Sequence, residues 1–126
     1  MSNITSSSNF SVFMPLNTVI VLTSNIPVFI PTGVNEVPEG AVIYYNTVNT
    51  RYELKTTDGL DTSNLTYVVN LRKTSVVENS LNNLQVIVFG VIDAKRLKYY
   101  NSVSNSFLDM TLNNITLHHP NIKVIK

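Results

Sequence analysis

Short runs of apolar residues, separated by polar residues, prolines and glycines, predict a chain built mainly from β-strands. Residues 18–22 and 28–30 are apolar or β-branched and are bounded by polar residues or prolines, so we expect two extended segments there. Residues 31–33 (Pro-Thr-Gly) and 38–40 (Pro-Glu-Gly) predict turns, because proline fixes φ and glycine permits a positive φ.

The middle of the chain predicts a hairpin. Residues 41–45 and 51–55 have the composition of strands, and the polar segment 46–50 joins them. In the second strand Tyr52 and Leu54 alternate with charged residues, which predicts one buried side and one solvent-facing side. The charged positions are Arg51, Glu53 and Lys55.

The next part of the chain contains its most apolar segment. Residues 66–71 predict a strand, and residues 75–84 predict a polar connection. Residues 85–92 are nearly all apolar but too few to cross a membrane, which favours a central strand covered on both faces. Gly90 within this run indicates a β-bulge or the close approach of another backbone segment.

One C-terminal segment favours a helix. Ser106 and Asp109 form a start similar to a capping box, and Pro120 would end the helix. Between them, apolar residues recur at positions i, i+4 and i+7, and these are Leu108, Leu112 and Ile115. A final strand is expected over residues 122–125.

The composition fits a single domain. The 126 residues are 44% hydrophobic and 13% charged, include no cysteine and carry a formal net charge of +1. Abundant aliphatic residues and the small net charge exclude a disordered chain, and the lack of cysteine excludes disulfides and thiolate metal sites. A charge so close to zero argues against a protein that mainly neutralises nucleic-acid phosphates.

The first part of the chain is uncharged, because the first acidic residue is Glu36 and the first basic residue is Arg51. Residues 1–15 are expected to form a flexible arm, followed by a single mainly β domain over residues 16–126. No secretory signal is expected without a basic leading segment, and polar residues and prolines interrupt the apolar runs before they reach the length of a membrane span. We infer that the domain's own core or a partner covers part of this uncharged region.

Candidate catalytic and metal-binding residues are few. His118 and His119 are the only histidines, and adjacent positions on a helix point about 100° apart, so contact with the last helix carbonyls is favoured over a shared metal ion. The Asp58-Gly59 turn lacks the ligand pattern of a calcium loop. No Gly-x-Ser-x-Gly motif or phosphate-binding glycine loop occurs in the sequence. We therefore expect no enzyme activity, catalytic residue, metal or cofactor.

The one basic cluster covers residues 95–98 and adjoins Tyr99 and Tyr100. A nucleic-acid patch would combine such charges and rings, but a short cluster of this kind is more typical of a solvated strand edge with buried tyrosines. Neither direct nucleic-acid binding nor membrane binding is expected.

The order of several segments resembles a known family. The first three segments are Pro-Glu-Gly with the apolar strand that follows it, a Thr-Arg-Tyr segment and a valine-rich strand. After a polar spacer, the chain continues with a second apolar strand, a leucine-rich segment and a closing Asn-Ile-Lys-Val. These segments are residues 38–43, 50–52, 67–71, 86–91, 108–115 and 121–124. Their order resembles the lambda-type head decoration proteins of tailed bacteriophages. Asn121 stands where that family prefers glycine, and residues 67–71 lack its usual small residue and glycine.

The resemblance implies a β-clip-like small barrel or sandwich with one short C-terminal helix. It implies a homotrimer, made in the host cytoplasm, that binds the major capsid protein on the outer surface of an expanded shell at local three-fold positions. There it would stabilise the virion against the pressure of packaged DNA. The N-terminal arm would bind the capsid through its apolar residues and its proline, namely Ile4, Phe10, Val12, Phe13 and Pro15.

Two functions of other classes stay open at the level of the sequence. A fibre-like or adhesin-like β-module would bind a cell-surface glycan through an exposed aromatic platform, for which Tyr44, Tyr45, Tyr99 and Tyr100 are candidates. Strand alternation places Tyr44 and Tyr45 on opposite faces, so at most one of them is available. A small hydrolase that uses His118 is the other alternative.

Overall fold

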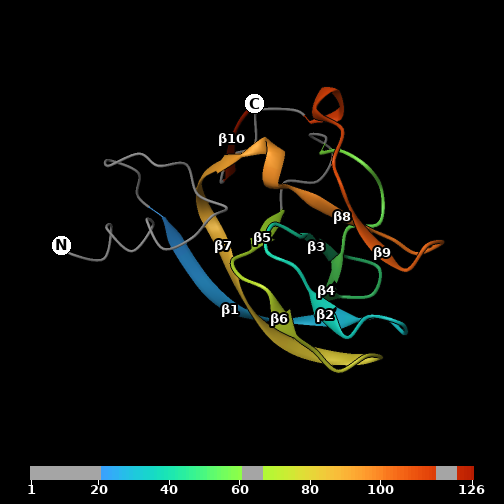
Figure 1. The fold of residues 1–126 in the computed structure, drawn as a ribbon. Coiled ribbons are helices and arrows are strands. Elements are labelled where there is room, and N and C mark those ends of the chain that lie inside the picture. The colour runs from blue at the N-terminus through green and yellow to red at the C-terminus, as the bar shows by residue number, and fades with distance from the viewer. Residues whose placement is uncertain (1–20, 61–66, 116–121) are drawn as a thin grey trace.

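The computed structural model of the protein describes residues 21–60, 67–115 and 122–126, and it is mainly β (Figure 1). The strands are β1 (Leu22–Ile30), β2 (Glu36–Val37), β3 (Val42–Asn46), β4 (Arg51–Leu54), β5 (Val68–Asn70), β6 (Thr74–Ser75), β7 (Ser80–Asp93), β8 (Lys98–Asn101), β9 (Ser106–Asp109) and β10 (Ile122–Ile125). Two 3-10 turns, η2 (Ala94–Arg96) and η3 (Leu112–Asn114), are the helical segments within these ranges. Nothing helical in them has the length and apolarity needed to cross a bilayer.

The main sheet closes into a small barrel. β1, β4, β3, β5 and β7 are hydrogen-bonded in that order, and β1 also pairs with β7. The closing pairing is antiparallel and runs from Leu22 opposite Phe89 to Ile30 opposite Ser80, whereas β1 and β4 pair in parallel over a much shorter stretch. β10 pairs in parallel with the last part of β7. The prediction of a mainly β small barrel is therefore confirmed.

Two apolar clusters lie on opposite sides of the wall formed by β3, β5 and β7. The interior cluster draws on all the barrel strands, and it includes Val28, Ile30, Ile43, Leu54, Val68, Leu84 and Val86. The outer cluster joins the outside of this wall to the C-terminal segments, and it includes Val42, Val69, Ile87, Leu97, Met110, Ile115 and Ile122. Both faces of this wall are consequently buried.

β7 is longer than its apolar segment suggested. Val86 and Ile87 are fully buried in opposite clusters, which confirms coverage on both faces at the centre of the strand. The strand already begins at Ser80, so the predicted polar connection over residues 75–84 is wrong in its second half: burial alternates from Ser80 onward, with Leu81 and Asn83 exposed and Leu84 fully buried. Phe89 is exposed, and its pairing with β1 shows a register shift that skips Val88.

β1 is one continuous strand, although the sequence predicted two separate segments. Pro27 lies inside it, opposite Asn83 of β7. Pairing with β4 begins only at Val28, so within the described residues one edge of β1 has no paired strand at Pro27. A residue without an N–H is tolerated at such a position.

The predicted hairpin is confirmed as β3 and β4, which pair from Ile43 opposite Leu54 to Asn46 opposite Arg51. The expected alternation of buried and solvent-facing side chains is not present, because Arg51, Tyr52 and Glu53 are all half-buried and Lys55 is buried. Its ammonium group donates hydrogen bonds to the backbone oxygen and hydroxyl of Thr57, which satisfy the charge locally.

The predicted C-terminal helix is wrong. Ser106 begins β9, which pairs with β8, and only the short turn η3 follows within residues 106–115. Leu108 is exposed whereas Ile115 is buried in the outer cluster, so the apolar spacing does not mark one helix face. The Thr and Asn residues between them are weak helix formers, and strand pairing outweighs the spacing. The remainder of the predicted helix, residues 116–119, lies outside the described residues.

The turn predicted at residues 38–40 is present and is fixed by a buried amide. Gly40 has a φ of +89°, and its N–H donates to the backbone oxygen of Asn70 at 2.9 Å. The fully buried Asn70 side-chain nitrogen lies 3.2, 3.0 and 2.8 Å from the carbonyl oxygens of Val37, Pro38 and Arg72. Asn70 thereby ties β5 to the segment that enters β3.

Candidate functional site

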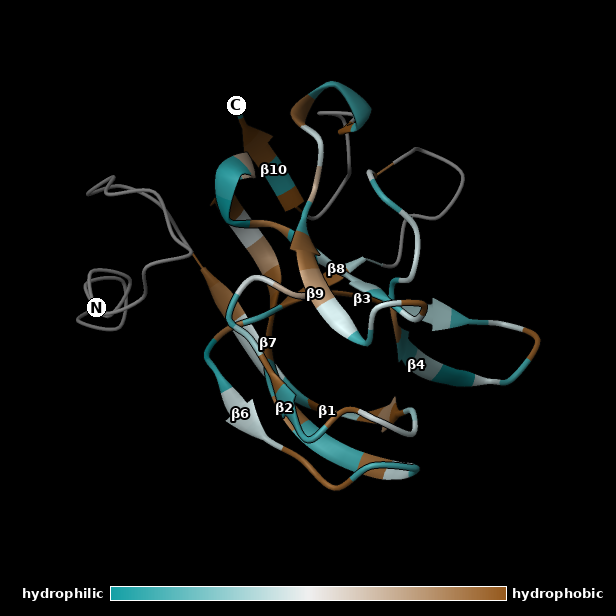
Figure 2. Ribbon diagram, turned by 45° about the vertical axis from the view of Figure 1, so that its right-hand side comes forward, coloured by the Kyte–Doolittle hydropathy of each residue, from teal (hydrophilic) through white to brown (hydrophobic). Residues whose placement is uncertain are grey.

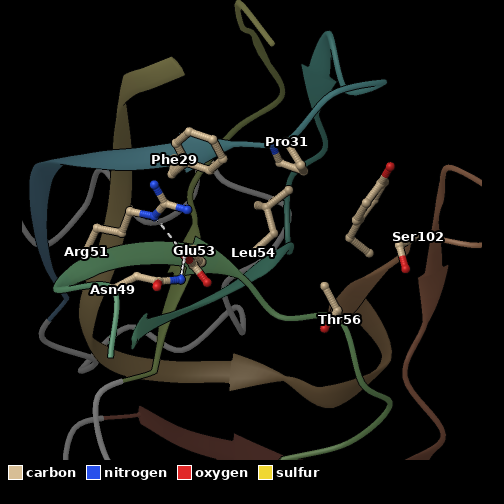
Figure 3. Close-up of a pocket in the computed structure, with 9 residues that line it drawn as sticks. Phe29, Pro31, Asn49, Arg51, Glu53, Leu54, Thr56 and Ser102 are labelled. Carbon is tan, nitrogen blue, oxygen red and sulfur yellow. Dashed lines mark hydrogen bonds and ion pairs between the residues drawn. The ribbon is translucent and has the colours of Figure 1, made fainter. Parts of the chain in front are cut away.

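A groove runs along the β4 side of β1 and crosses to β8. It has a volume of about 280 Å³, and its walls come mainly from Phe29, Pro31, Leu54 and Tyr100. Figure 3 shows Asn49 at one end and Ser102 at the other, with the side chains of β1 and β4 between them. This volume lies just under the roughly 300–1,000 Å³ of small-molecule sites, so the groove suits a short ligand.

An arginine is held in a fixed orientation in this groove. The central carbon of the Arg51 guanidinium lies 3.7 Å from the centre of the Phe29 ring (Figure 3). Its Nε donates to the Glu53 carboxylate at 2.7 Å. Within the described part of the chain its two terminal amino groups have no hydrogen-bond partner. The ring and the carboxylate therefore orient the guanidinium and leave its outer edge available.

Glu53 is surrounded by donors. The side-chain nitrogens of Asn46 and Asn49 each lie 2.9 Å from its oxygens, and the Tyr44 hydroxyl lies at 3.4 Å. Burial raises the pKa of Glu53, but hydrogen bonds from Arg51, Asn46 and Asn49 outweigh it and hold the pKa below its usual value. Burial and the charge of Glu53 raise the pKa of the Tyr44 hydroxyl. The Glu53 carboxylate therefore stays ionised at neutral pH and positions the Arg51 guanidinium.

Two similar hairpin loops stand at the ends of the groove. Asn46 accepts hydrogen bonds from the N–H groups of Val48 and Asn49, and Asn101 accepts them from those of Val103 and Ser104. The fifth residue of each loop, Thr50 and Asn105, has a positive φ, and the third is a valine that is 88% or 93% exposed. The groove was not predicted, but the repeated signal Asn-x-Val, followed by a positive-φ residue two positions later, could have identified its two ends.

A second surface is formed by the outward side of β1 and β7. No charged residue occurs in residues 22–30 or 80–92. Leu22, Leu81 and Phe89 are large apolar residues exposed on these strands, and Leu22 faces Phe89 across the pairing. Figure 2 shows apolar colouring where β1 begins beside β7. We call this surface the β1–β7 face. Depletion of charge together with exposed apolar residues is typical of the centre of a protein interface.

The residues predicted for the capsid-binding arm lie outside the described residues. They are Ile4, Phe10, Val12, Phe13 and Pro15. His118 and His119 also lie outside them. Within the described ranges no group of three or more histidine or carboxylate side chains could hold a metal ion.

The four tyrosines proposed as a glycan platform do not come together. Tyr44 packs against the outer cluster, while Tyr45 contacts Tyr52 at 5.1 Å between ring centres, and Tyr52 packs against the interior cluster. The prediction that Tyr44 and Tyr45 face opposite sides is confirmed. Tyr99 is half-buried, and Tyr100 is 2% exposed with its hydroxyl donating to Asn105.

Lys98 of the basic cluster and Asp58 have structural partners. Lys98 forms an ion pair with Asp109 across the β8–β9 hairpin. Asp58 accepts hydrogen bonds from the backbone and hydroxyl of Thr111 and from the Asn114 side chain, so its oxygens hold two loops together. Burial raises the pKa of Asp58, but these hydrogen bonds outweigh it and lower the pKa overall.

No protein-family model, curated protein or solved structure matches the chain.

Proposed function

We propose that the protein is a structural protein of a bacteriophage virion. It would bind the major capsid protein on the outer surface of an expanded head, as a homotrimer, and stabilise the shell without a cofactor. The observation that carries this proposal is the β1–β7 face, because the same uncharged stretch of sequence continues from this face into the N-terminal segment. The resemblance to phage head decoration proteins supports the same function.

An uncharged face can be covered by a partner without removing water from ions, which is costly when the ions are left unpaired. Phe89 and Leu22 supply exposed apolar area at the end of β1 that adjoins the N-terminal segment. Phe10 and Phe13, which precede this face in the same uncharged sequence, are the proposed further contacts with the capsid.

The size of the face explains why a single copy would bind weakly. β1 has nine residues, which at about 3.4 Å per residue span about 30 Å. With two strands about 10 Å wide including side chains, the face covers about 300 Å², compared with roughly 800 Å² per partner in a stable complex. The arm must supply additional area, and three linked copies would add avidity.

The test is co-sedimentation with expanded capsids that have been stripped of their own decoration protein. The full chain should pellet saturably at about one copy per capsid subunit. Asn83→Lys places a charge at the centre of the β1–β7 face and should weaken binding at least about tenfold, because the new charge must be desolvated. Phe10→Asp combined with Phe13→Asp should weaken it in the same way. Ser104→Lys adds the same charge on the β8–β9 loop and serves as the matched control.

Failure of the full chain to pellet would refute the proposal, and so would equal binding of Asn83→Lys and the unmodified protein. Thermal unfolding of each variant separates loss of binding from loss of folding. A glycan-array signal in the absence of pelleting would instead favour the adhesin-like module.

A further inference from the structure

We propose that the groove between β1, β4 and β8 is a binding site for a short acidic peptide segment, one in which a carboxylate adjoins an aliphatic side chain. The carboxylate would pair with the outer edge of the Arg51 guanidinium, and the aliphatic group would occupy the part of the groove lined by Pro31, Leu54 and Tyr100. The site goes beyond capsid binding, since its arginine comes from β4 and not from the β1–β7 face, although Phe29 beneath it lies on β1 opposite Leu81.

The charge arrangement favours an incoming carboxylate. Glu53 uses the Nε of Arg51, so the two terminal amino groups remain as a parallel pair of donors. That pair matches the geometry of a carboxylate, which accepts two parallel hydrogen bonds from a guanidinium. Glu53 itself has donors on both oxygens, so its own charge is already compensated.

The site is also organised before the ligand arrives. The guanidinium is held over the Phe29 ring and hydrogen-bonded to Glu53, and the Asn49 amide braces the same carboxylate. Arginine side chains normally lose much rotational freedom on binding. Here the Arg51 side chain is already ordered in the free protein, so a small ligand loses less entropy when it binds and binds more tightly.

The walls favour a peptide over a sugar. Sugar sites generally offer a free aromatic ring face, but one face of Phe29 is covered by Arg51 and Tyr100 is almost fully buried. The half-buried Pro31 provides aliphatic contact area instead. At the end of the groove, the Ser102 hydroxyl has no hydrogen-bond partner among the residues that the structure describes, and it can donate to a peptide carbonyl.

The test compares two probes that differ only at the terminal group, N-acetyl-L-leucine with its carboxylate and N-acetyl-L-leucinamide with a neutral carboxamide, titrated into the ¹⁵N-labelled full chain. We expect saturable NMR shifts at the Arg51 Nε–H and the Ser102 amide with the acid, with a Kd on the order of millimolar for so small a ligand. The neutral amide should bind at least about tenfold more weakly, which corresponds to the loss of one charge-assisted pair.

Arg51→Gln should remove the preference for the acid, whereas Arg96→Gln, on the exposed η2 turn, should keep it. Equal binding of the two probes to the unmodified protein would overturn the proposal, as would the absence of saturable shifts up to about 50 mM. The comparison of probes is decisive even if Arg51→Gln fails to fold, because it uses the unmodified chain. Neither result depends on whether the protein binds capsids.

Discussion

The buried side chain of Asn70 gives the sharpest test of how the chain is held together. Its nitrogen faces the carbonyl oxygens of Val37, Pro38 and Arg72, and its side-chain oxygen is buried with no hydrogen-bond partner. Two substitutions separate these features. Asn70→Ala removes both the donors and the unpaired oxygen, while Asn70→Asp keeps the shape but replaces the donors with a second oxygen.

The expected loss for Asn70→Ala is about 2 kcal/mol in the free energy of unfolding. Two N–H groups make hydrogen bonds worth about 1 kcal/mol each, and the small cavity costs about 1 kcal/mol more. Removing the unpaired oxygen returns about 1 kcal/mol. At roughly 4 °C per kcal/mol for a chain of this size, the midpoint of thermal unfolding should fall by about 8 °C.

Asn70→Asp should be clearly worse at neutral pH, with a loss of about 4 kcal/mol, because a buried carboxylate would face three carbonyl oxygens. Burial and these oxygens raise the pKa of the new carboxyl in the folded protein. The penalty is therefore full above that raised pKa and disappears as the pH falls through the unfolded value of about 4.

The assay is urea unfolding followed by circular dichroism at pH 7 and pH 4.5. The reasoning is wrong if Asn70→Asp is as stable as Asn70→Ala at pH 7, because the side-chain nitrogen would then not be what faces the three carbonyls. Unchanged slopes of the unfolding curves in urea would show that the variants unfold from the same compact state.

Two further predictions concern the loops. Gly40→Ala should destabilise by more than about 2 kcal/mol, because φ is +89° and the added Cβ would lie 2.0 Å from the backbone oxygen of Arg96; a thermal midpoint within a few degrees of the unmodified protein would contradict this. Asp58 has a lowered pKa, so its stabilising effect is present above the unfolded pKa of about 4 and is lost as the pH falls through the lower folded value. Asp58→Asn should therefore lower the free energy of unfolding at pH 7 and make it fall less steeply below pH 4. The measurement is the free energy of unfolding as a function of pH, with hydrogen exchange at the Thr111 amide as a local readout. An equally steep loss of stability below pH 4 in the variant and the unmodified protein would contradict this.

The parts of the fold that local chemistry determines could be predicted from the sequence. The β3–β4 hairpin, the turn at residues 38–40 and the burial at the centre of β7 follow from alternation, Pro-Glu-Gly and an apolar run. The parts that depend on distant partners could not. Residues 106–109 carry a helix-like pattern, yet pairing with β8 makes them a strand, and Pro27 is accommodated only because of where β4 begins to pair.

The groove was missed for a similar reason. The alternation of residues predicts that Arg51 and Glu53 lie on the solvent-facing side of their strand. Nothing in the neighbouring sequence indicates that Phe29 would lie beneath the guanidinium. That contact depends on a parallel pairing between strands more than twenty residues apart in the chain. Lys55 shows the same limit, because its burial is compensated by a loop residue that follows it rather than by its strand.

The closing pairing of the barrel also sets a delay during synthesis. Ile30 pairs with Ser80 and Leu22 with Phe89, separations of 50 and 67 residues. At roughly 5–20 residues per second, β1 waits about 3 to 13 s on the ribosome for its partner strand. During that time the uncharged β1 strand is exposed to other nascent chains. It contains no charged residue that would discourage aggregation, and Pro27 is its only residue that cannot donate a backbone hydrogen bond to another strand. The yield of folded protein should therefore depend on expression rate and temperature more strongly than its final stability would indicate.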